Sequence, residues 1–306
     1  MLTCIPGIKK ITKKKCSGET SSAKYCYGVW LKHLVLLYDN GMNRFPETIL
    51  ELGPGASVGV GIAAVISGVG KYYAIDIAKY SEYESNIQIF EQLVAMFKGR
   101  EAYPDVEGFP DIKPFLNEKG FPEEILSSEH LDACLDEKRL GVIRSVLEGR
   151  KPENDLDIDI KYVAQWGDSD IIGEASVDLI FSHAVLEHMD NITEVFPQMC
   201  RWLRRGGYMS HQIDFSCHGT ADSWNGHWAY SDIVWNLIKG RRTYSINRLS
   251  YSFFENLLTE NGFEITCIEK EIDKKGIERS KIAKKFRMIS EDDLVCKGAF
   301  IQAKKL

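Results

Sequence analysis

The fold is decided by the stretch Ile49-Leu50-Glu51-Leu52-Gly53-Pro54-Gly55, which predicts a buried strand, a terminal acid and a glycine-rich turn. Glycines in such a turn can adopt backbone angles closed to other residues, and without a Cβ they let a ligand lie against the main chain. A helix is expected from about Ser57 to Ser67, and its first N–H groups would face the turn. This order is typical of a doubly wound sheet that binds a nucleotide-like cofactor at the carboxyl ends of its strands.

The details of the turn disfavour a dinucleotide cofactor. A dinucleotide fingerprint needs a third glycine, at the position that Val58 occupies here. Glu51 is instead well placed to hold a cationic ammonium group. Asp76 ends a second predicted strand about 20 residues beyond the turn, where a carboxylate can accept both ribose hydroxyls. One acid for an amino group and another for a ribose favour S-adenosylmethionine.

Later segments extend this pattern in a recognisable order. Glu51-Leu-Gly-Pro-Gly55 is followed by the strand-like segments Lys71–Asp76, Tyr162–Asp168 and Val177–His183, by Leu186-Glu187-His188, and by the turn Arg204-Arg-Gly-Gly207 before a fifth strand. From about Thr48 to its C-terminus, the chain resembles the class I S-adenosylmethionine-dependent methyltransferases. The resemblance implies an α/β fold with a Rossmann-like, seven-stranded mixed sheet whose last strand is antiparallel. It implies S-adenosylmethionine as cofactor, with cofactor-binding roles for Glu51, Gly53, Gly55, Asp76, Asp168, Ser182 and His183.

The spacing of these segments also predicts the domain organisation. Residues 1–47 are expected to form an N-terminal tail and a covering helix, and residues 48–306 the methyltransferase domain. The connection between the second and third strands is far longer than a crossover helix needs, and four prolines interrupt it. We therefore expect an insertion at about 99–160 that acts as a lid or substrate-recognition cap.

Composition narrows the class of protein. The 306 residues carry a net charge of −6, which gives no indication of a nucleic-acid partner, and 44% of them are hydrophobic, enough for one sizeable core. The sequence has no membrane span and no secretory signal, so a cytoplasmic protein is expected. Eight cysteines without a C-x-x-C pair predict neither a disulfide framework nor a zinc cluster. The oligomeric state is left open.

Catalytic candidates lie on the predicted fifth strand. His211 is the candidate general base, and Asp214 is its orienting partner or the base itself, because ligands of such sheets lie just beyond the strand ends. The alternative is that this pair only satisfies loop backbone groups and that catalysis rests on alignment of the reactants. His211, Asp214, His218 and His227 match no standard ligand spacing, so no metal is predicted.

An aromatic loop follows the fifth strand and carries the candidate substrate-binding residues Trp224, Asn225, His227 and Trp228. Aromatic faces with polar groups beside them suit a sugar or another ring compound. The loop also resembles one in bacterial methyltransferase-domain proteins associated with surface polysaccharides, which favours a glycan acceptor. The alternative is that the tryptophans anchor a long loop onto the core.

The sequence thus predicts O-methylation of a small-molecule or glycan hydroxyl. One alternative is a nicotinamide-dependent oxidoreductase, which Val58 and the segment Leu186–His188 disfavour. The other is a non-catalytic cofactor-binding protein that acts as a partner or regulatory subunit.

Overall fold

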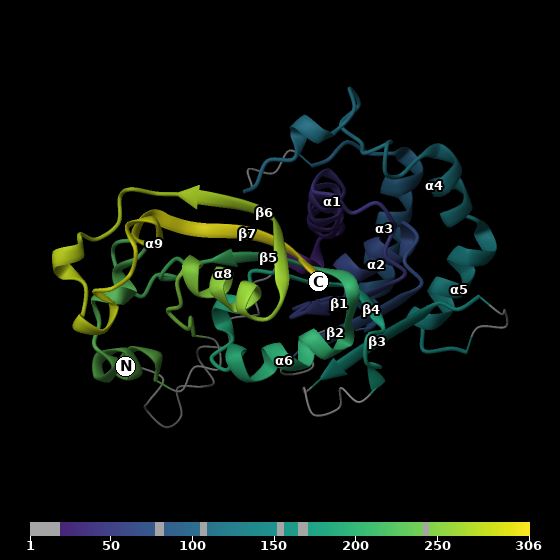
Figure 1. Ribbon diagram of the computed structural model, residues 1–306. Coiled ribbons are helices and arrows are strands. Elements are labelled where there is room, and N and C mark those ends of the chain that lie inside the picture. Colours follow the sequence, from purple (N-terminus) through teal and green to yellow (C-terminus); the bar gives the residue numbers. More distant parts are fainter. Residues whose placement is uncertain (1–18, 77–82, 105–108, 152–155, 165–170, 241–244) are drawn as a thin grey trace.

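The computed structural model describes residues 19–76, 83–104, 109–151, 156–164, 171–240 and 245–306. Within these residues seven strands form one sheet in the order β3-β2-β1-β4-β5-β7-β6 (Figure 1). The first five pair in parallel, and β7 runs antiparallel between β5 and β6. The predicted mixed sheet is therefore confirmed. Its strands are β1 (Thr48–Leu52), β2 (Lys71–Asp76), β3 (Asp159–Ala164), β4 (Val177–His183), β5 (Leu203–Asp214), β6 (Phe263–Ile272) and β7 (Cys296–Lys305).

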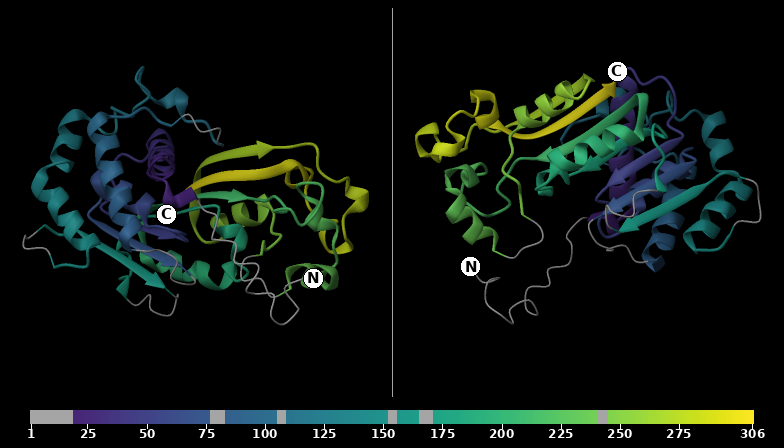
Figure 2. Two further views of the ribbon diagram at one scale, coloured as in Figure 1. Left: turned by 180° about the vertical axis from the view of Figure 1, so that it is seen from behind. Right: turned by 60° about the horizontal axis from the view of Figure 1, so that its bottom comes forward.

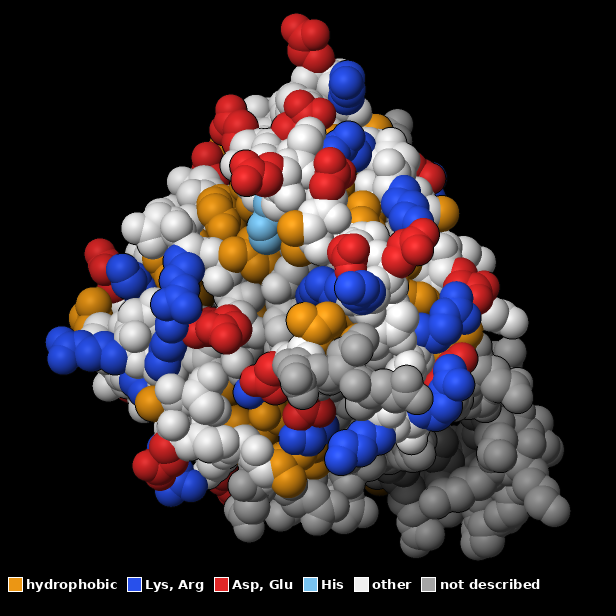
Figure 3. Space-filling model, turned by 90° about the vertical axis from the view of Figure 1, so that its right-hand side faces the viewer, with side chains coloured by type: hydrophobic (Ala, Val, Ile, Leu, Met, Phe, Trp, Pro, Cys, Tyr) orange, Lys and Arg blue, Asp and Glu red, His pale blue; other side chains and the backbone are white. Residues whose placement is uncertain are grey.

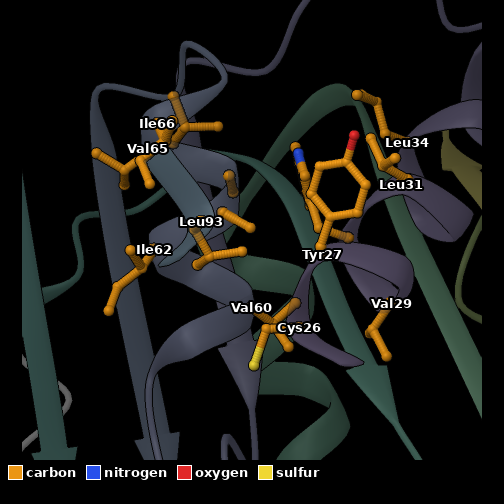
Figure 4. Close-up of a cluster of buried hydrophobic side chains, with 14 of the residues drawn as sticks. Cys26, Tyr27, Val29, Leu31, Leu34, Val60, Ile62, Val65, Ile66 and Leu93 are labelled. Atoms are coloured by element: carbon orange, nitrogen blue, oxygen red, sulfur yellow. The ribbon is translucent and has the colours of Figure 1, made fainter. Parts of the chain in front are cut away.

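One face of the sheet is covered by α1 (Ala23–Asp39), α2 (Gly59–Ile66) and α3 (Tyr83–Gly99). Figure 4 shows part of their shared core, with side chains from all three helices. Close packing here depends on glycine. A Cβ at Gly59 would lie 2.4 Å from Sγ of Cys26 in α1, and one at Gly61 would lie 2.0 Å from the ring of Tyr72 in β2. The glycines of α2 thus let α1 and the sheet approach its backbone.

The other face is covered by α6 (Ile192–Trp202) and α8 (Tyr251–Glu260), which pack on a second apolar cluster. α6 buries Ile192, Phe196, Met199 and Trp202, and Pro197 lies inside the helix. α8 begins at Tyr251 after the N-cap Ser250. Ser252, which the sequence pattern suggests as the first residue of a capping box, instead donates its hydroxyl to Asp293 at 2.6 Å.

The insertion between β2 and β3 contains α4 (Ser128–Cys134) and α5 (Glu137–Leu147). Arg139 donates to the carbonyl groups of Val65 and Val69 at 2.7 and 3.1 Å, and a ring nitrogen of His130 lies 2.8 Å from the carbonyl oxygen of Ser67. Both contacts hold the insertion at the C-terminal end of α2, away from the glycine-rich turn at its N-terminus. On this side of the molecule charged side chains of both signs are interspersed (Figure 3).

An earlier part of the insertion lies along α1 instead. Pro104 lies against Gly28, and the Lys32 ammonium donates to the carbonyl of Phe109 at 2.9 Å. A lid role for the insertion stays a prediction.

Two further segments pack together beyond the carboxyl end of β5 and form a cover over it. This cover consists of the described residues of 215–250, including α7 (Asp232–Lys239), and of residues 273–295, including α9 (Glu291–Val295). The two segments lie side by side in the views of Figures 1 and 2 and share an apolar cluster around Trp228 and Ile282. Among the described residues, no helix combines the length and apolar character that a membrane crossing needs.

Candidate functional site

The glycine-rich turn after β1 is held tightly by its neighbours. Gly53 and Gly55 have φ angles of +63° and +74°, which favour glycine. The Gly53 N–H donates to the carbonyl of Ile75 in β2 at 2.8 Å. A Cβ at Gly53 would lie 2.7 Å from the side chain of Val185, which follows β4. The turn therefore sits where β1, β2 and β4 end, which is the position that a cofactor needs.

A short helical turn, η3 (Glu19–Ser21), lies over this loop. The Ala56 N–H donates to Oγ1 of Thr20 at 3.0 Å, and a Cβ at Gly55 would lie 3.3 Å from the same oxygen. The Val58 N–H donates to Oδ1 of Asn86 at 3.2 Å. N–H groups that were expected to face a ligand thus have side-chain partners in this structure.

Glu51 lies below the turn with 4% of its surface exposed. Its alternation with Leu50 and Leu52 points it toward α1 and α2, and it accepts a hydrogen bond from the Tyr72 hydroxyl at 2.5 Å. Burial raises the pKa of Glu51 to about 8, the nearby Asp76 adds to this, and the Tyr72 hydrogen bond opposes it. A cationic partner would stabilise the ionised form of this carboxyl group, and the ammonium role of Glu51 stays a prediction.

The other predicted cofactor residues occupy different settings. Asp76 ends β2 beside the turn and is 9% exposed, and its ribose role stays a prediction. Asp168 lies outside the described residues. The Ser182 hydroxyl is fully buried and lies 2.8 Å from Nδ1 of His211, so the side chain of Ser182 points toward β5 and not toward the strand edge. His183 ends β4 on the α1 side, where its ring meets that of Tyr25 edge-on at a centroid distance of 6.0 Å.

The side chain of His211 is buried within β5. It lies opposite Ser182 in the β4–β5 register, is 3% exposed, and borders a small apolar cavity beside Leu186 and Phe196. Burial lowers the pKa of His211 to about 3, so its imidazole stays neutral near pH 7. This setting is at odds with the predicted role of general base, because a substrate at the strand edge cannot reach the ring.

Asp214 does lie at the carboxyl edge, where it pairs with His218, which the sequence pattern raises only as a candidate metal ligand and not as a catalytic residue. Its Oδ2 is 3.0 Å from Nε2 of His218, and its Oδ1 accepts from the Ser216 N–H at 2.7 Å. Burial alone would raise the pKa of Asp214, but these hydrogen bonds lower it below its usual range. His218 adopts a φ of +48°, a left-handed conformation that is uncommon for residues other than glycine and is often found at functional sites.

A second pair of polar residues lies beside this one, in η6 (Leu186–His188). Glu187 is 2% exposed, and neither of its carboxylate oxygens has a side-chain hydrogen-bond partner among the described residues. Burial holds the pKa of Glu187 well above its usual range, and the backbone of Glu187 and Asp214 offsets part of this shift. The ring of His188 lies 5.1 Å from that of His218. The two histidines border a cavity of about 70 Å³ with Trp235.

The predicted substrate-binding residues of the aromatic loop form part of a core. Nε1 of Trp224 donates to Asp273, Nε1 of Trp228 donates to Arg248, and Nδ2 of Asn225 donates to Leu294, each to a carbonyl oxygen at 3.1 Å. Asn225, His227 and Trp228 are at most 1% exposed. Their arrangement supports the alternative that the loop is anchored to the core, and it leaves these three no surface for direct contact with a substrate.

Comparison with known proteins supports the same class. A family model described as a methyltransferase domain matches residues 31–268. Similar solved structures include S-adenosylmethionine-dependent methyltransferases from Methanosarcina mazei and Mesorhizobium loti, both 13% identical. The match with the first structure covers 89% of this chain and 97% of that chain, with a TM-score of 0.45. The match with the second covers 94% of this chain and 100% of that chain, with a TM-score of 0.42. No curated protein sequence matches the chain. The family match covers most of the chain, which therefore belongs to the methyltransferase-domain family and is an S-adenosylmethionine-dependent methyltransferase.

Proposed function

We propose that the protein transfers the methyl group of S-adenosylmethionine to a hydroxyl oxygen of a small molecule or glycan. The observation that carries this proposal is the position of the Asp214–His218 pair at the carboxyl end of β5, beside Glu187 and His188. Carboxylate and imidazole groups at this edge suit the removal of a proton from a weakly acidic hydroxyl.

The cofactor would lie across the ends of β1, β2 and β4. Glu51 would balance the charge of its ammonium group, and Asp76 would accept hydrogen bonds from the ribose hydroxyls. Gly53 and Gly55 would let the cofactor approach the main chain of the turn. Asp168 would meet the adenine amino group, as the resemblance to the family implies. Ser182 and His183 would contribute through the backbone at the end of β4.

When bound, S-adenosylmethionine would supply the methyl group. The C–O bond to the acceptor oxygen would form as the C–S bond breaks, and the electron pair would stay on sulfur in S-adenosylhomocysteine. Asp214 accepts a hydrogen bond from Nε2 of His218 and thereby orients the ring, so the other ring nitrogen can accept the hydroxyl proton. Alignment of the two reactants supplies the rest of the acceleration.

The residues of the aromatic loop act indirectly in this proposal. Trp224, Asn225 and Trp228 hold the residues that follow β5 against 273–295, and His227 packs against Trp228 and Trp235. The two segments together position His218. His211 supports the end of β4 through Ser182.

Two measurements test the proposal. Calorimetry should show stoichiometric binding of S-adenosylmethionine and no binding of nicotinamide cofactors. Transfer of labelled methyl groups should then be measured on a panel of glycans and phenols, with amines and carbon acids as comparison. Hydroxyl acceptors should be labelled. Transfer only to nitrogen or carbon would overturn the oxygen assignment, and cofactor binding without any transfer would favour a non-catalytic partner protein.

A further inference from the structure

We propose that Glu187, His188 and His218 form a binding site for a divalent transition-metal ion that binds the acceptor hydroxyl. One ligand atom from each residue lies within 4.8 Å of the others. Two ligands at about 2.1 Å from one ion are at most roughly 4.2 Å apart, so small side-chain movements bring all three onto a shared ion. The inference rests on the proposed function, because the acceptor would be the hydroxyl named there.

The unusual state of Glu187 is the strongest observation for this site. A carboxyl group that is 2% exposed, with no side-chain partner for either oxygen among the described residues, is costly unless a cation or a proton compensates it. Nδ1 of His188 is likewise buried without a partner among those residues. Lys239 borders the same cavity, but it pairs with Asp190 and so leaves Glu187 uncompensated.

The hydrogen bond between Asp214 and His218 supports the same site. A carboxylate that accepts a hydrogen bond from one ring nitrogen fixes the tautomer and leaves the other nitrogen to a metal, which is the usual arrangement around metal-bound histidines. Asp214 is therefore a positioning residue in this site, while His218 is a ligand.

The set of donors indicates the kind of ion. Two imidazoles and one carboxylate suit Zn²⁺, Fe²⁺, Co²⁺ or Mn²⁺ better than Mg²⁺ or Ca²⁺, which prefer oxygen donors. Three protein ligands leave coordination positions open. The adjoining cavity of about 70 Å³ has room for roughly two water-sized groups, or for the hydroxyl end of an acceptor.

The ion would act as a Lewis acid in methyl transfer. With the ion bound, Nδ1 of His218 is a ligand and no longer the proton acceptor. The acceptor hydroxyl binds the ion, which lowers the pKa of the hydroxyl, and its proton passes to water. The resulting oxygen anion forms the C–O bond, and the sulfonium C–S bond breaks with its electron pair on sulfur. No redox change is needed.

Metal binding can be measured without any methyl acceptor. The chelator-treated full-length protein is titrated with Zn²⁺ by calorimetry and with Co²⁺ by visible absorption. We expect one equivalent to bind. E187Q and H188Q should each weaken binding by more than about 100-fold, and D214N by about 10- to 100-fold. H130Q, which removes an imidazole at the far end of α2, is the matched control and should bind as wild type does. Circular dichroism verifies that each variant is folded.

The outcomes separate this inference from the proposed function. Failure of Zn²⁺ and Co²⁺ to bind, or equal binding by wild type and E187Q, would overturn the metal site. Labelled-methyl transfer to a hydroxyl that persists unchanged after chelation would overturn the role of the ion while leaving O-methylation in place. Loss of transfer on chelation, with recovery on adding one equivalent of Zn²⁺ or Mn²⁺, would support it.

Discussion

Nε2 of His218 lies 3.0 Å from Oδ2 of Asp214, and this contact joins the end of β5 to the loop that follows it. Because the pair lies at the edge where the acceptor is expected, H218Q should lower kcat by about 100-fold or more. The KM for S-adenosylmethionine should stay close to that of wild type, since the cofactor residues are unchanged. Steady-state kinetics with the acceptor identified in the panel measures both. An equal loss in H130Q would show that the effect is not specific to this edge.

Glu51 should make cofactor affinity depend on pH. Its pKa is about 8 in the folded, cofactor-free protein, against 4.5 as the reference value. The neutral carboxyl group of buried Glu51 stabilises the folded protein. This contribution to the free energy of unfolding is fully present below pH 4.5 and is lost as pH rises through 8. An ammonium group prefers the ionised form, so affinity should rise between pH 6.5 and 8, by up to about tenfold per unit. Calorimetry at several pH values measures this.

The matched variant for this test is E51Q, which can keep the hydrogen bond from Tyr72 but cannot ionise. Its affinity for S-adenosylmethionine should be lower and nearly independent of pH over the same range. If wild type and E51Q follow parallel curves, Glu51 does not face the ammonium group.

Gly61 should be intolerant of even one added carbon. A Cβ there would lie 2.0 Å from the ring of Tyr72, which is fully buried and bonded to Glu51. G61A should therefore lower the free energy of unfolding by about 1–3 kcal/mol or more, through overpacking. In G141A the same change falls on an exposed helical position with nothing within 4 Å, and it should raise stability by up to about 1 kcal/mol. Denaturant titration of both proteins decides the matter.

Trp228 should matter for stability rather than for acceptor binding. W228F leaves the buried carbonyl of Arg248 without its indole donor, which should cost about 1–3 kcal/mol of unfolding free energy. The KM for the acceptor should not change at temperatures where the variant is folded. A raised KM for the acceptor with unchanged stability would instead indicate that Trp228 contacts the acceptor directly, as the aromatic character of the loop suggests.

The sequence predicts the sheet much better than it predicts the site. β1 and β2 end at the predicted residues because a buried run, an acid and a turn follow one another locally. His218 is harder to foresee, since its contact with Asp214 depends on how the chain turns after β5. Ser252 shows the same limit in a helix, because its partner Asp293 is 41 residues away and outcompetes a local cap. The placement of α4 and α5 likewise depends on Arg139 reaching the end of α2.

The contact between Val185 and Gly53 bears on the order in which the reactants bind. The chain passes from Val185, which lies against the cofactor turn, directly into the segment that carries Glu187 and His188. A cofactor seated on Gly53 would hold this segment in place before the acceptor arrives. We expect a compulsory-order mechanism in which S-adenosylmethionine binds first and S-adenosylhomocysteine leaves last. Product-inhibition kinetics measures this: S-adenosylhomocysteine should compete with the cofactor and inhibit noncompetitively against the acceptor.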